Sequence, residues 1–423
     1  MSLTPYGKFR CRTLPVLGAL LVGLALPSAA LGQAQYSVLY SFCSSANCAD
    51  GAGPSGKLVS DKLGNLYGTT AGGGAYQAGT VFELSPSNGN WTETVLYNFC
   101  LNKVRDCPDG YNPVAGPTFD NVGNLYGTTQ GGGAYGLGSV FKLTPPSTQG
   151  AAWTEAVVWS FGAQGDGKEP VSNVIFDASG NLYGTTSSGG AYNGGTAFQL
   201  VPTAGGQWSE NILLSFGFDP FNGYDPRAAV AFDTSGNLYG TTVEGGAHGN
   251  DGWGVLYKLS PTSQLPWTET VLFRFRTGTG ANPLSAVNFD SGGNLYCTLS
   301  AWGVNGAGGV FRLTSQGREH TVFFSGTPDG ASPAAGVLIH GNTLYGTTEL
   351  GGSVNGGALF KLEGATKTIL YSFCSEAGCA DGTHPVATLI SRSNSLYGTA
   401  VDGGANGKGG VVFEISAGSR FSY

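Results

Sequence analysis

The sequence predicts an all-β fold, a seven-bladed β-propeller made of four-stranded antiparallel blades. A Leu-Tyr pair, usually within "GNLYGTT", recurs seven times, and each copy lies among four short strand-like runs separated by turn residues. That arrangement is typical of propeller blades. Glycine accounts for 72 of the 423 residues and charged residues for only 11%, a balance that favours turn-rich β structure over helices. The motif tyrosines are Tyr67, Tyr126, Tyr183, Tyr239, Tyr296, Tyr345 and Tyr397.

The second copy shows how one blade is written along the chain. Its four expected strands are "PVAGPTFD", "GNLYGTT", "GSVFKLTP" and "WTEAVVWSF", and the turn from Asp120 to Gly123 closes the first hairpin. Because strand side chains alternate, the tyrosine and the glycine of "LYGTT" face opposite sides of the blade. We expect each tyrosine to fill the space left by a neighbouring blade's glycine. The repeated tryptophans should also pack between blades; they are Trp91, Trp153, Trp208 and Trp267.

The two ends of the repeat array predict a closed ring. The seventh copy stops after "VFEI", Val412 to Ile415, without the usual outer strand, while an unpaired "VLYSF", Val38 to Phe42, precedes the first copy. Pairing these two segments would complete the last blade and leave no open sheet edge.

The first 34 residues are expected to be a signal peptide. Lys8, Arg10 and Arg12 precede the apolar run "LPVLGALLVGLALP" and the small residues "SAALGQA", which is the pattern of an export signal. A retained signal anchor is the alternative. We therefore expect residues 35–423 to form one propeller domain, secreted to the extracellular space or periplasm.

The charge of the mature chain argues against a nucleic-acid partner. The leader holds three of the 20 basic residues and none of the 27 acidic ones, so 17 basic and 27 acidic residues remain, a net charge of −10. Such a chain repels phosphate backbones. No later stretch approaches the ~20 continuous apolar residues of a membrane span. We expect a soluble monomer.

The pattern "GNLYGTT…GG…G-VF-L…VLYSF" resembles the choice-of-anchor tandem-repeat GloVer family over residues 36–415. This resemblance implies an exported repeat protein; it brings no established chemistry and no site residues.

Six cysteines form three close pairs just after outer strands, in "FCSSANC", "FCLNKVRDC" and "FCSEAGC". In an exported protein, three local disulfides are the simplest interpretation, whereas zinc binding would need other spacings and nearby histidines. Cys297 replaces the motif glycine and is expected to be a buried free thiol. The predicted pairs are Cys43–Cys48, Cys100–Cys107 and Cys374–Cys379.

Five crossovers between blades carry an aspartate four residues before a proline: Asp50, Asp109, Asp166, Asp329 and Asp381. Five symmetric carboxylates could form a ring for Ca²⁺ or sugar hydroxyls. The alternative is an ordinary turn role, in which each aspartate accepts bonds from nearby backbone N–H groups. We expect the turn role, and no bound metal or cofactor.

Functional residues are expected where one copy departs from the pattern, because a site needs one constellation and not seven. Blade four departs most: its enlarged hairpin loop is "VEGGAHGNDGWG" and its crossover is "FDPFNGYDPRAAV". Tyr76, Tyr135 and Tyr192, in the corresponding loops of blades one to three, could extend this site as an aromatic strip. The candidate ligand-binding residues of blade four are Glu244, His248, Asp251, Trp253, Tyr224, Asp225 and Arg227.

These residue types point to a binding or scaffold module for extracellular carbohydrate or a cell-surface component. The alternative is a carbohydrate-active enzyme, a polysaccharide lyase or glycoside hydrolase, in which His248 with Glu244 or Asp251 would transfer protons. A purely structural envelope protein is a third possibility. No phosphate-binding loop, HExxH helix or GxSxG elbow occurs in the chain.

Overall fold

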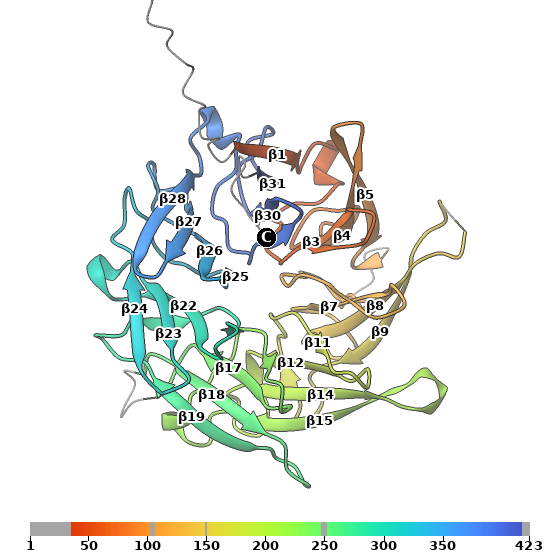
Figure 1. Cartoon of the computed structure of the whole chain (residues 1–423). Helices are drawn as coiled ribbons and strands as arrows, with labels where there is room; N and C mark the ends of the chain where they lie inside the picture. Colours follow the sequence, from red (N-terminus) through yellow and green to blue (C-terminus); the bar gives the residue numbers. More distant parts are fainter. Residues whose placement is uncertain (1–34, 102–105, 149, 247–251, 417–423) are drawn as a thin grey trace, which may run out of the picture.

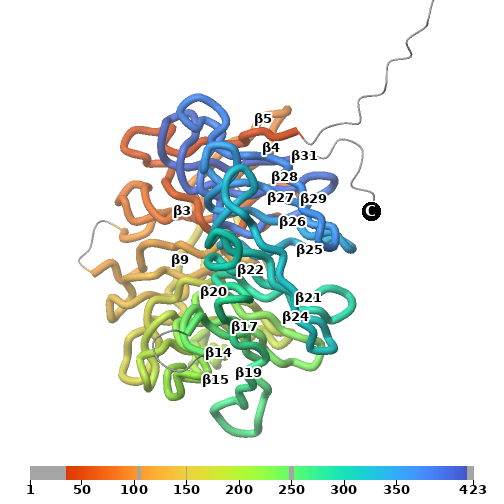
Figure 2. Tube along the Cα trace, turned by 90° about the vertical axis from the view of Figure 1, so that its left-hand side faces the viewer, coloured from red at the N-terminus to blue at the C-terminus, as the bar shows by residue number. Residues whose placement is uncertain are grey.

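The computed structural model describes residues 35–101, 106–148, 150–246 and 252–416. Seven sheets stand around a central axis like the blades of a propeller (Figure 1), and the sheets lie side by side when the ring is viewed from its edge (Figure 2). The predicted fold class and blade number are confirmed.

Each blade is an antiparallel sheet whose strands follow the chain from the axis outward. Blades one and two contain β2 (Val59–Ser60), β3 (Leu66–Thr70), β4 (Thr80–Ser87), β5 (Asn90–Asn98), and β6 (Thr118–Phe119), β7 (Leu125–Thr129), β8 (Ser139–Thr144), β9 (Thr154–Ser160). Blades three and four contain β11 (Ile175–Phe176), β12 (Leu182–Thr186), β14 (Thr196–Pro202), β15 (Trp208–Ser215), and β16 (Ala231–Phe232), β17 (Leu238–Thr242), β18 (Val255–Ser260), β19 (Thr268–Arg274). A small extra ladder joins β10 (Gly167–Lys168) to β13 (Ser188–Gly189).

The remaining blades follow the same order. Blade five contains β21 (Asn288–Phe289), β22 (Leu295–Ala301), β23 (Gly309–Leu313) and β24 (Glu319–Phe323), with β20 (Ala281–Pro283) also paired to β22. Blade six contains β25 (Leu338–His340), β26 (Thr343–Thr348), β27 (Ala358–Glu363) and β28 (Thr366–Ser372), and blade seven β29 (Ile390–Arg392), β30 (Ser395–Ala400) and β31 (Val411–Ser416).

The N-terminal strand closes the ring. β1 (Gln35–Ser41) is the outer strand of blade seven, antiparallel to β31, with Val38 opposite Phe413 and Tyr36 opposite Ile415. In Figure 1 the red β1 lies beside the dark blue β31. The predicted clasp is confirmed, and it begins three residues earlier than the sequence pattern indicated.

The glycine of "LYGTT" leaves space for an aromatic ring of its own blade. A Cβ added to Gly127 would lie 2.5 Å from Cζ of Phe141, which is on the adjacent strand β8. Tyr126, on the other side of β7, packs instead against Phe176 of blade three, with ring centroids 5.1 Å apart. The expectation that a neighbour's tyrosine fills the glycine space was therefore wrong. The phenylalanine directly opposite on the next strand fills it.

The first threonine of the motif ties one blade to the next at the axis. The Thr128 hydroxyl is buried and donates to the Ser172 carbonyl of blade three at 2.9 Å. The second threonine stays within its blade, since Thr129 and Ser139 hydroxyls lie 2.8 Å apart. Bonds equivalent to that of Thr128 are made by Thr69, Thr185, Thr241 and Thr298.

The crossovers add a second ring of links between blades. In each one, the residue before the proline has a positive φ, and its N–H donates to a carbonyl in the preceding blade's hairpin loop. Asp225 shows the pattern, with φ of 60° and a 2.8 Å bond to the Gly194 carbonyl. The equivalent donors are Gly53, Asn112, Glu169, Asn282, Ser332 and His384.

All three predicted disulfides are present: Cys43–Cys48, Cys100–Cys107 and Cys374–Cys379. Each closes a short loop at the start of a crossover. Cys297 is the free, buried thiol that the sequence predicted, and it is 1% exposed.

Adding one methyl group in the motif should destabilise the ring. We predict that Gly127→Ala lowers the free energy of unfolding by about 1–3 kcal/mol, because the new Cβ overlaps the Phe141 ring. The control is Gly278→Ala, where a Cβ meets nothing within 4 Å. Urea denaturation of both variants tests the prediction, and equal effects would contradict it.

Candidate functional site

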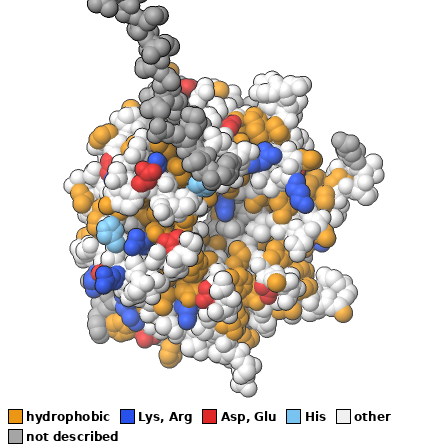
Figure 3. Space-filling view, viewed as in Figure 1, with side chains coloured by type: hydrophobic (Ala, Val, Ile, Leu, Met, Phe, Trp, Pro, Cys, Tyr) orange, Lys and Arg blue, Asp and Glu red, His pale blue; other side chains and the backbone are white. Residues whose placement is uncertain are grey.

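The ring has two faces of different character. The hairpin loops between each second and third strand, together with the crossovers, form one face, which we call the loop face; it lies on the left in Figure 2. The tight turns between the first and second strands and between the third and fourth strands form the opposite face, which we call the hairpin face. Figure 3 shows the hairpin face, with a hollow at the axis.

The structure brings four of the predicted blade-four residues together on the loop face. Tyr224 and Glu244 exchange backbone hydrogen bonds of 3.0 and 3.2 Å, and burial together with the nearby Glu244 carboxylate raises the pKa of Tyr224. Asp225 forms an ion pair with Arg227, 2.8 Å from Nε to Oδ2. Burial raises the pKa of Asp225, and the guanidinium partly offsets this. The four side chains thus form one polar cluster.

Two other predicted residues, His248 and Asp251, lie outside the described residues. The remaining one, Trp253, is half-buried and packs edge to face on Trp302 of blade five, with ring centroids 4.3 Å apart. A second aromatic pair lies toward blade three, where the rings of Tyr192 and Phe218 are 5.1 Å apart. The polar cluster of blade four is therefore flanked by an aromatic pair on each side.

Exposed aromatic side chains are concentrated on the loop face. Phe218 is 76% exposed, and Tyr135 and Tyr192, two members of the expected aromatic strip, are about half exposed. Tyr76, the third member, is less exposed. The sequence pattern did not indicate Phe218, Tyr111 or Trp302, because each occurs in only one crossover or loop and leaves the spacing of the repeated motif unchanged.

The axial channel opens beside the polar cluster. It has a volume of about 130 Å³ and is lined by three residues from each of the seven blades. Arg227 and Lys57 are the charged members of that lining. The Lys57 side chain reaches solvent inside the channel, yet enclosure by the channel walls lowers its pKa. Two basic side chains thus line the channel beside the polar cluster.

The crossover aspartates point into their own loops and not toward a common ligand. Asp50 is 4% exposed and accepts bonds from the Ser44 and Ser45 N–H groups at 2.9 and 3.2 Å and from the Tyr40 hydroxyl at 2.9 Å. Asp381 has the same set of partners in blade seven. Among the described residues, no group of three or more His, Cys, Asp or Glu could hold a metal ion. The turn role is confirmed.

Three of these aspartates face a half-buried glutamate on the outer strand of the following blade. Burial, with the charge of Asp50, raises the pKa of Glu93 to about 8. Burial and Asp109 raise that of Glu155 to about 7, and burial and Asp166 raise that of Glu210 to about 9. One carboxylate oxygen of each glutamate is buried without a hydrogen-bond partner among the described residues. Each aspartate–glutamate pair is therefore arranged so that its glutamate keeps a proton at an interface between blades.

Two other blades make the contact between crossover and outer strand with different residue pairs. In blade four the crossover has Asn222 in place of aspartate, and its amide donates to Glu269 at 3.0 Å. In blade six Lys367 replaces the glutamate and pairs with Asp329. In each of these blades one member of the pair is replaced and a favourable contact is kept, so this position serves the contact between blades.

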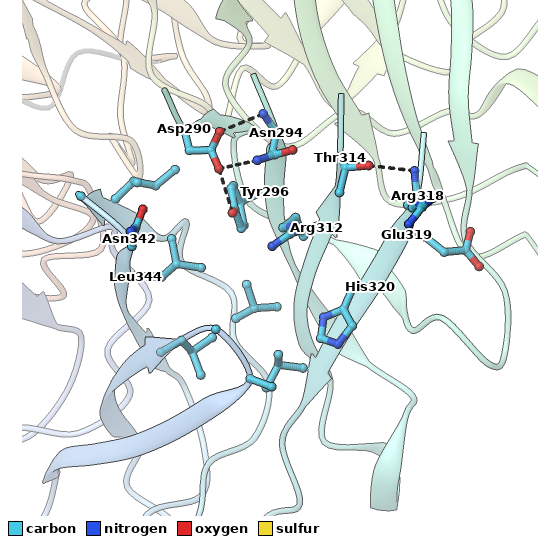
Figure 4. A pocket seen from close by; sticks show the side chains of 17 residues that line it. Asp290, Asn294, Tyr296, Arg312, Thr314, Arg318, Glu319, His320, Asn342 and Leu344 are labelled. Carbon is cyan, nitrogen blue, oxygen red and sulfur yellow. Dashed lines mark hydrogen bonds between the residues drawn. The ribbon is translucent and has the colours of Figure 1, made fainter. Parts of the chain in front are cut away.

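A cavity of about 640 Å³ lies on the hairpin face, between blades five and six. Arg312 and His320 project into it from blade five, and Leu344 faces them from blade six (Figure 4). In Figure 3, basic and histidine side chains gather over this part of the ring. His320 lies on β24, and the sequence pattern did not indicate this cavity.

Comparison with known proteins identifies the repeat. The model of one protein family, described as the Gloeobacter/Verrucomicrobia repeat, matches residues 28–252, 94–297 and 247–423. The chain belongs to this family. A search of curated proteins found no match. Among the described residues, no helix is long and apolar enough to cross a membrane.

Solved structures with distant similarity share the fold of this repeat protein. A puromycin-hydrolysing peptidase of Mycobacterium tuberculosis is similar with a TM-score of 0.52 and 11% identity, over 92% of this chain and 55% of that one. PorZ, a surface component of the type-IX secretion system of Porphyromonas gingivalis, is similar with a TM-score of 0.50 and 15% identity, over 88% and 48%. The chain spans about half the length of both. At these identities the similarity concerns the fold alone.

The paired carboxyl groups predict an unusual pH dependence of stability. A carboxyl group whose pKa is raised by folding stabilises the protein below its unfolded pKa, near 4.5, and that stability is lost as the pH rises through the folded values of about 7 to 9. We predict that the free energy of unfolding falls by about 1 kcal/mol per pair between about pH 5 and about pH 9, after discounting for partial exposure.

Urea denaturation across this pH range measures the effect. Replacing Glu93, Glu155 and Glu210 by Gln should flatten the curve. The matched control is Glu319→Gln, at the same register position of blade five, where the carboxylate is exposed and pairs with Arg276 at 3.1 Å. A triple variant with the wild-type slope would contradict the prediction.

Proposed function

We propose that this protein is an exported binding module that holds a carbohydrate chain on the loop face, across blade four. The observation that supports this most strongly is the arrangement of two aromatic pairs, Tyr192–Phe218 and Trp253–Trp302, on either side of a polar cluster. Aromatic rings offer large rigid surfaces for sugar rings, and the polar groups between them can bond to hydroxyls.

The polar cluster has both kinds of hydrogen-bonding group that a sugar requires. Glu244 is exposed and accepts hydrogen bonds, while the exposed Arg227 guanidinium still has donors that Asp225 does not use. The basic channel mouth beside them favours a chain that carries carboxylates, such as a polyuronide. Acidic polysaccharide is therefore the ligand class that we propose.

Export is part of the same proposal. Three disulfides fit an oxidising compartment outside the cytoplasm. The expected signal peptide, residues 1–34, lies outside the described residues. In the alternative of a hydrolase or lyase, His248 would transfer protons together with Glu244 or Asp251, and both His248 and Asp251 lie outside the described residues. The proposal is therefore confined to binding, by a monomer.

The test is binding to immobilised alginate, polygalacturonate, xylan and mixed-linkage glucan, followed by calorimetry of the oligosaccharides that bind. We predict saturable binding to a polyuronide, and about tenfold weaker binding by the double variant Tyr192→Ala/Phe218→Ala, since each stacked ring contributes about 0.5–1.5 kcal/mol.

The matched control is Leu63→Ala, which removes an apolar side chain that is 81% exposed on the hairpin face. Its affinity should equal that of the wild type. Absence of binding to all four polymers, or equal loss in the control, would refute the proposal.

A further inference from the structure

A position that is tryptophan in four blades is alanine in blade six. Lys367 pairs with Leu362 just as Glu269 pairs with Leu259, so Ala365, which lies in the turn between β27 and β28, corresponds to Trp267, two residues before the paired position. In blade five, Tyr296 therefore lacks the indole that covers the motif tyrosine of four other blades. The equivalent ring contacts are Trp91–Tyr397, Trp153–Tyr67, Trp208–Tyr126 and Trp267–Tyr183, with centroids 6.2–6.4 Å apart.

The cavity of about 640 Å³ lies where that indole is missing. Tyr296 and Val310 form one wall, and Ile339, Leu344 and Leu362 form the apolar wall opposite, from blade six. Its volume is within the usual range of small-molecule sites, ~300–1,000 Å³. The space is open to the hairpin face, away from the blade-four cluster.

One row of side chains makes this cavity basic. Tyr296, Arg312 and His320 are directly paired across β22, β23 and β24, so their side chains lie on the same face of blade five (Figure 4). The exposed Arg318 adds a third basic group at the rim. In the other six blades the residue at the position of His320 is neutral: Ser37, Thr94, Ala156, Asn211, Thr270 and Thr368.

The central arginine has an unused donor. Arg312 lies directly opposite Tyr296 on the adjacent strand, and its Nε is buried without a hydrogen-bond partner among the described residues. A buried charged donor without a partner is costly, so the site favours an acceptor that carries negative charge.

The two carboxylates that line the cavity do not provide that acceptor. Asp290 accepts bonds from Asn294 and from the Tyr296 hydroxyl at 2.7–3.0 Å. Glu319 pairs with Arg276 at 3.1 Å. Both are already occupied by other donors.

We propose that this cavity binds a planar aromatic carboxylate. The aromatic ring takes the place of the missing indole, between Tyr296 and the apolar wall of blade six, and the carboxylate accepts from Arg312, with His320 beside it. The ring system of the ligand must be planar, because the equivalent space between other blades holds a flat indole in four cases. This site is separate from the loop face, and its ligand does not depend on what binds there.

Calorimetry with 2-naphthoate, compared with 2-naphthamide, tests the proposal on the full-length protein. We predict one saturable site for the acid and at least tenfold weaker binding of the amide, which has the same ring and no charge. Ala365→Trp should abolish binding, because it restores the indole to the slot, and thermal unfolding should show a fold at least as stable as the wild type. Arg312→Gln should weaken binding at least tenfold.

The control is Arg274→Gln, which removes an exposed arginine of blade four that neither lines the cavity nor pairs with a residue that does, and should leave the affinity unchanged. Wild-type affinity in Ala365→Trp, equal affinity for the amide, or no binding of 2-naphthoate would overturn the proposal. Should Ala365→Trp fail to fold, Arg312→Gln and the amide comparison decide the outcome.

Discussion

The whole ring depends on the contact between the inner strand of one blade and the chain of the next. In "LYGTT" every residue has a part in that contact or in the blade that makes it. The leucine is buried, the tyrosine packs on the next blade, and the glycine makes room for an aromatic ring of its own sheet. The first threonine donates across the interface and the second fastens the hairpin. Most of the seven interfaces make these contacts, which explains why the motif is repeated around the ring. In blades six and seven the first threonine, Thr347 or Thr399, has no hydrogen-bond partner among the described residues.

A motif used in this way cannot also be a functional site. Side chains become available to ligands only where the ring does not need them, in the loops at its faces, or where a packing residue is missing. The loop face around blade four is the first case, since Phe218 and Trp302 are exposed there without a role in the ring. The cavity beside Ala365 is the second case, because the absence of an indole at this position leaves a space between two blades.

The crossover aspartates show how symmetry can mislead. Five carboxylates at equivalent positions suggest a shared ligand, yet each one accepts hydrogen bonds from groups of its own loop. Most of them also interact with the outer strand of the next blade, where a glutamate or a lysine lies beside the carboxylate; in blade seven the Tyr36 hydroxyl donates to the backbone carbonyl of Asp381. The repeated charge is therefore part of the mechanism by which blades adhere.

Much of the fold could be predicted from the sequence because its determinants are local and repeated. Alternation, turn residues and the spacing of the motif predict blades, and the unpaired ends predict the clasp of β1 with β31. The cysteine pairs follow from their proximity in the chain. The partner of the glycine was predicted wrongly because alternation gives a direction but not which strand supplies the filling ring.

The sites were harder to predict for a physical reason. Tyr224, Asp225, Arg227 and Glu244 come together as expected, because crossover and hairpin loop of one blade are neighbours on the loop face. The cavity between blades five and six arises from a residue that is small where others are large. The effect of this small residue can be recognised only in the folded ring, where Ala365 of blade six and Tyr296 of blade five line the same cavity.

Native-state hydrogen exchange of the seven "LYGTT" strands tests most directly whether interlocked blades form one closed unit. A closed ring has no end from which to unravel, so slow amides of β3, β7, β12, β17, β22, β26 and β30 should exchange with the same free energy, that of global unfolding. Exchange that begins at β30 and spreads blade by blade, at lower free energies near the termini, would contradict the closed ring.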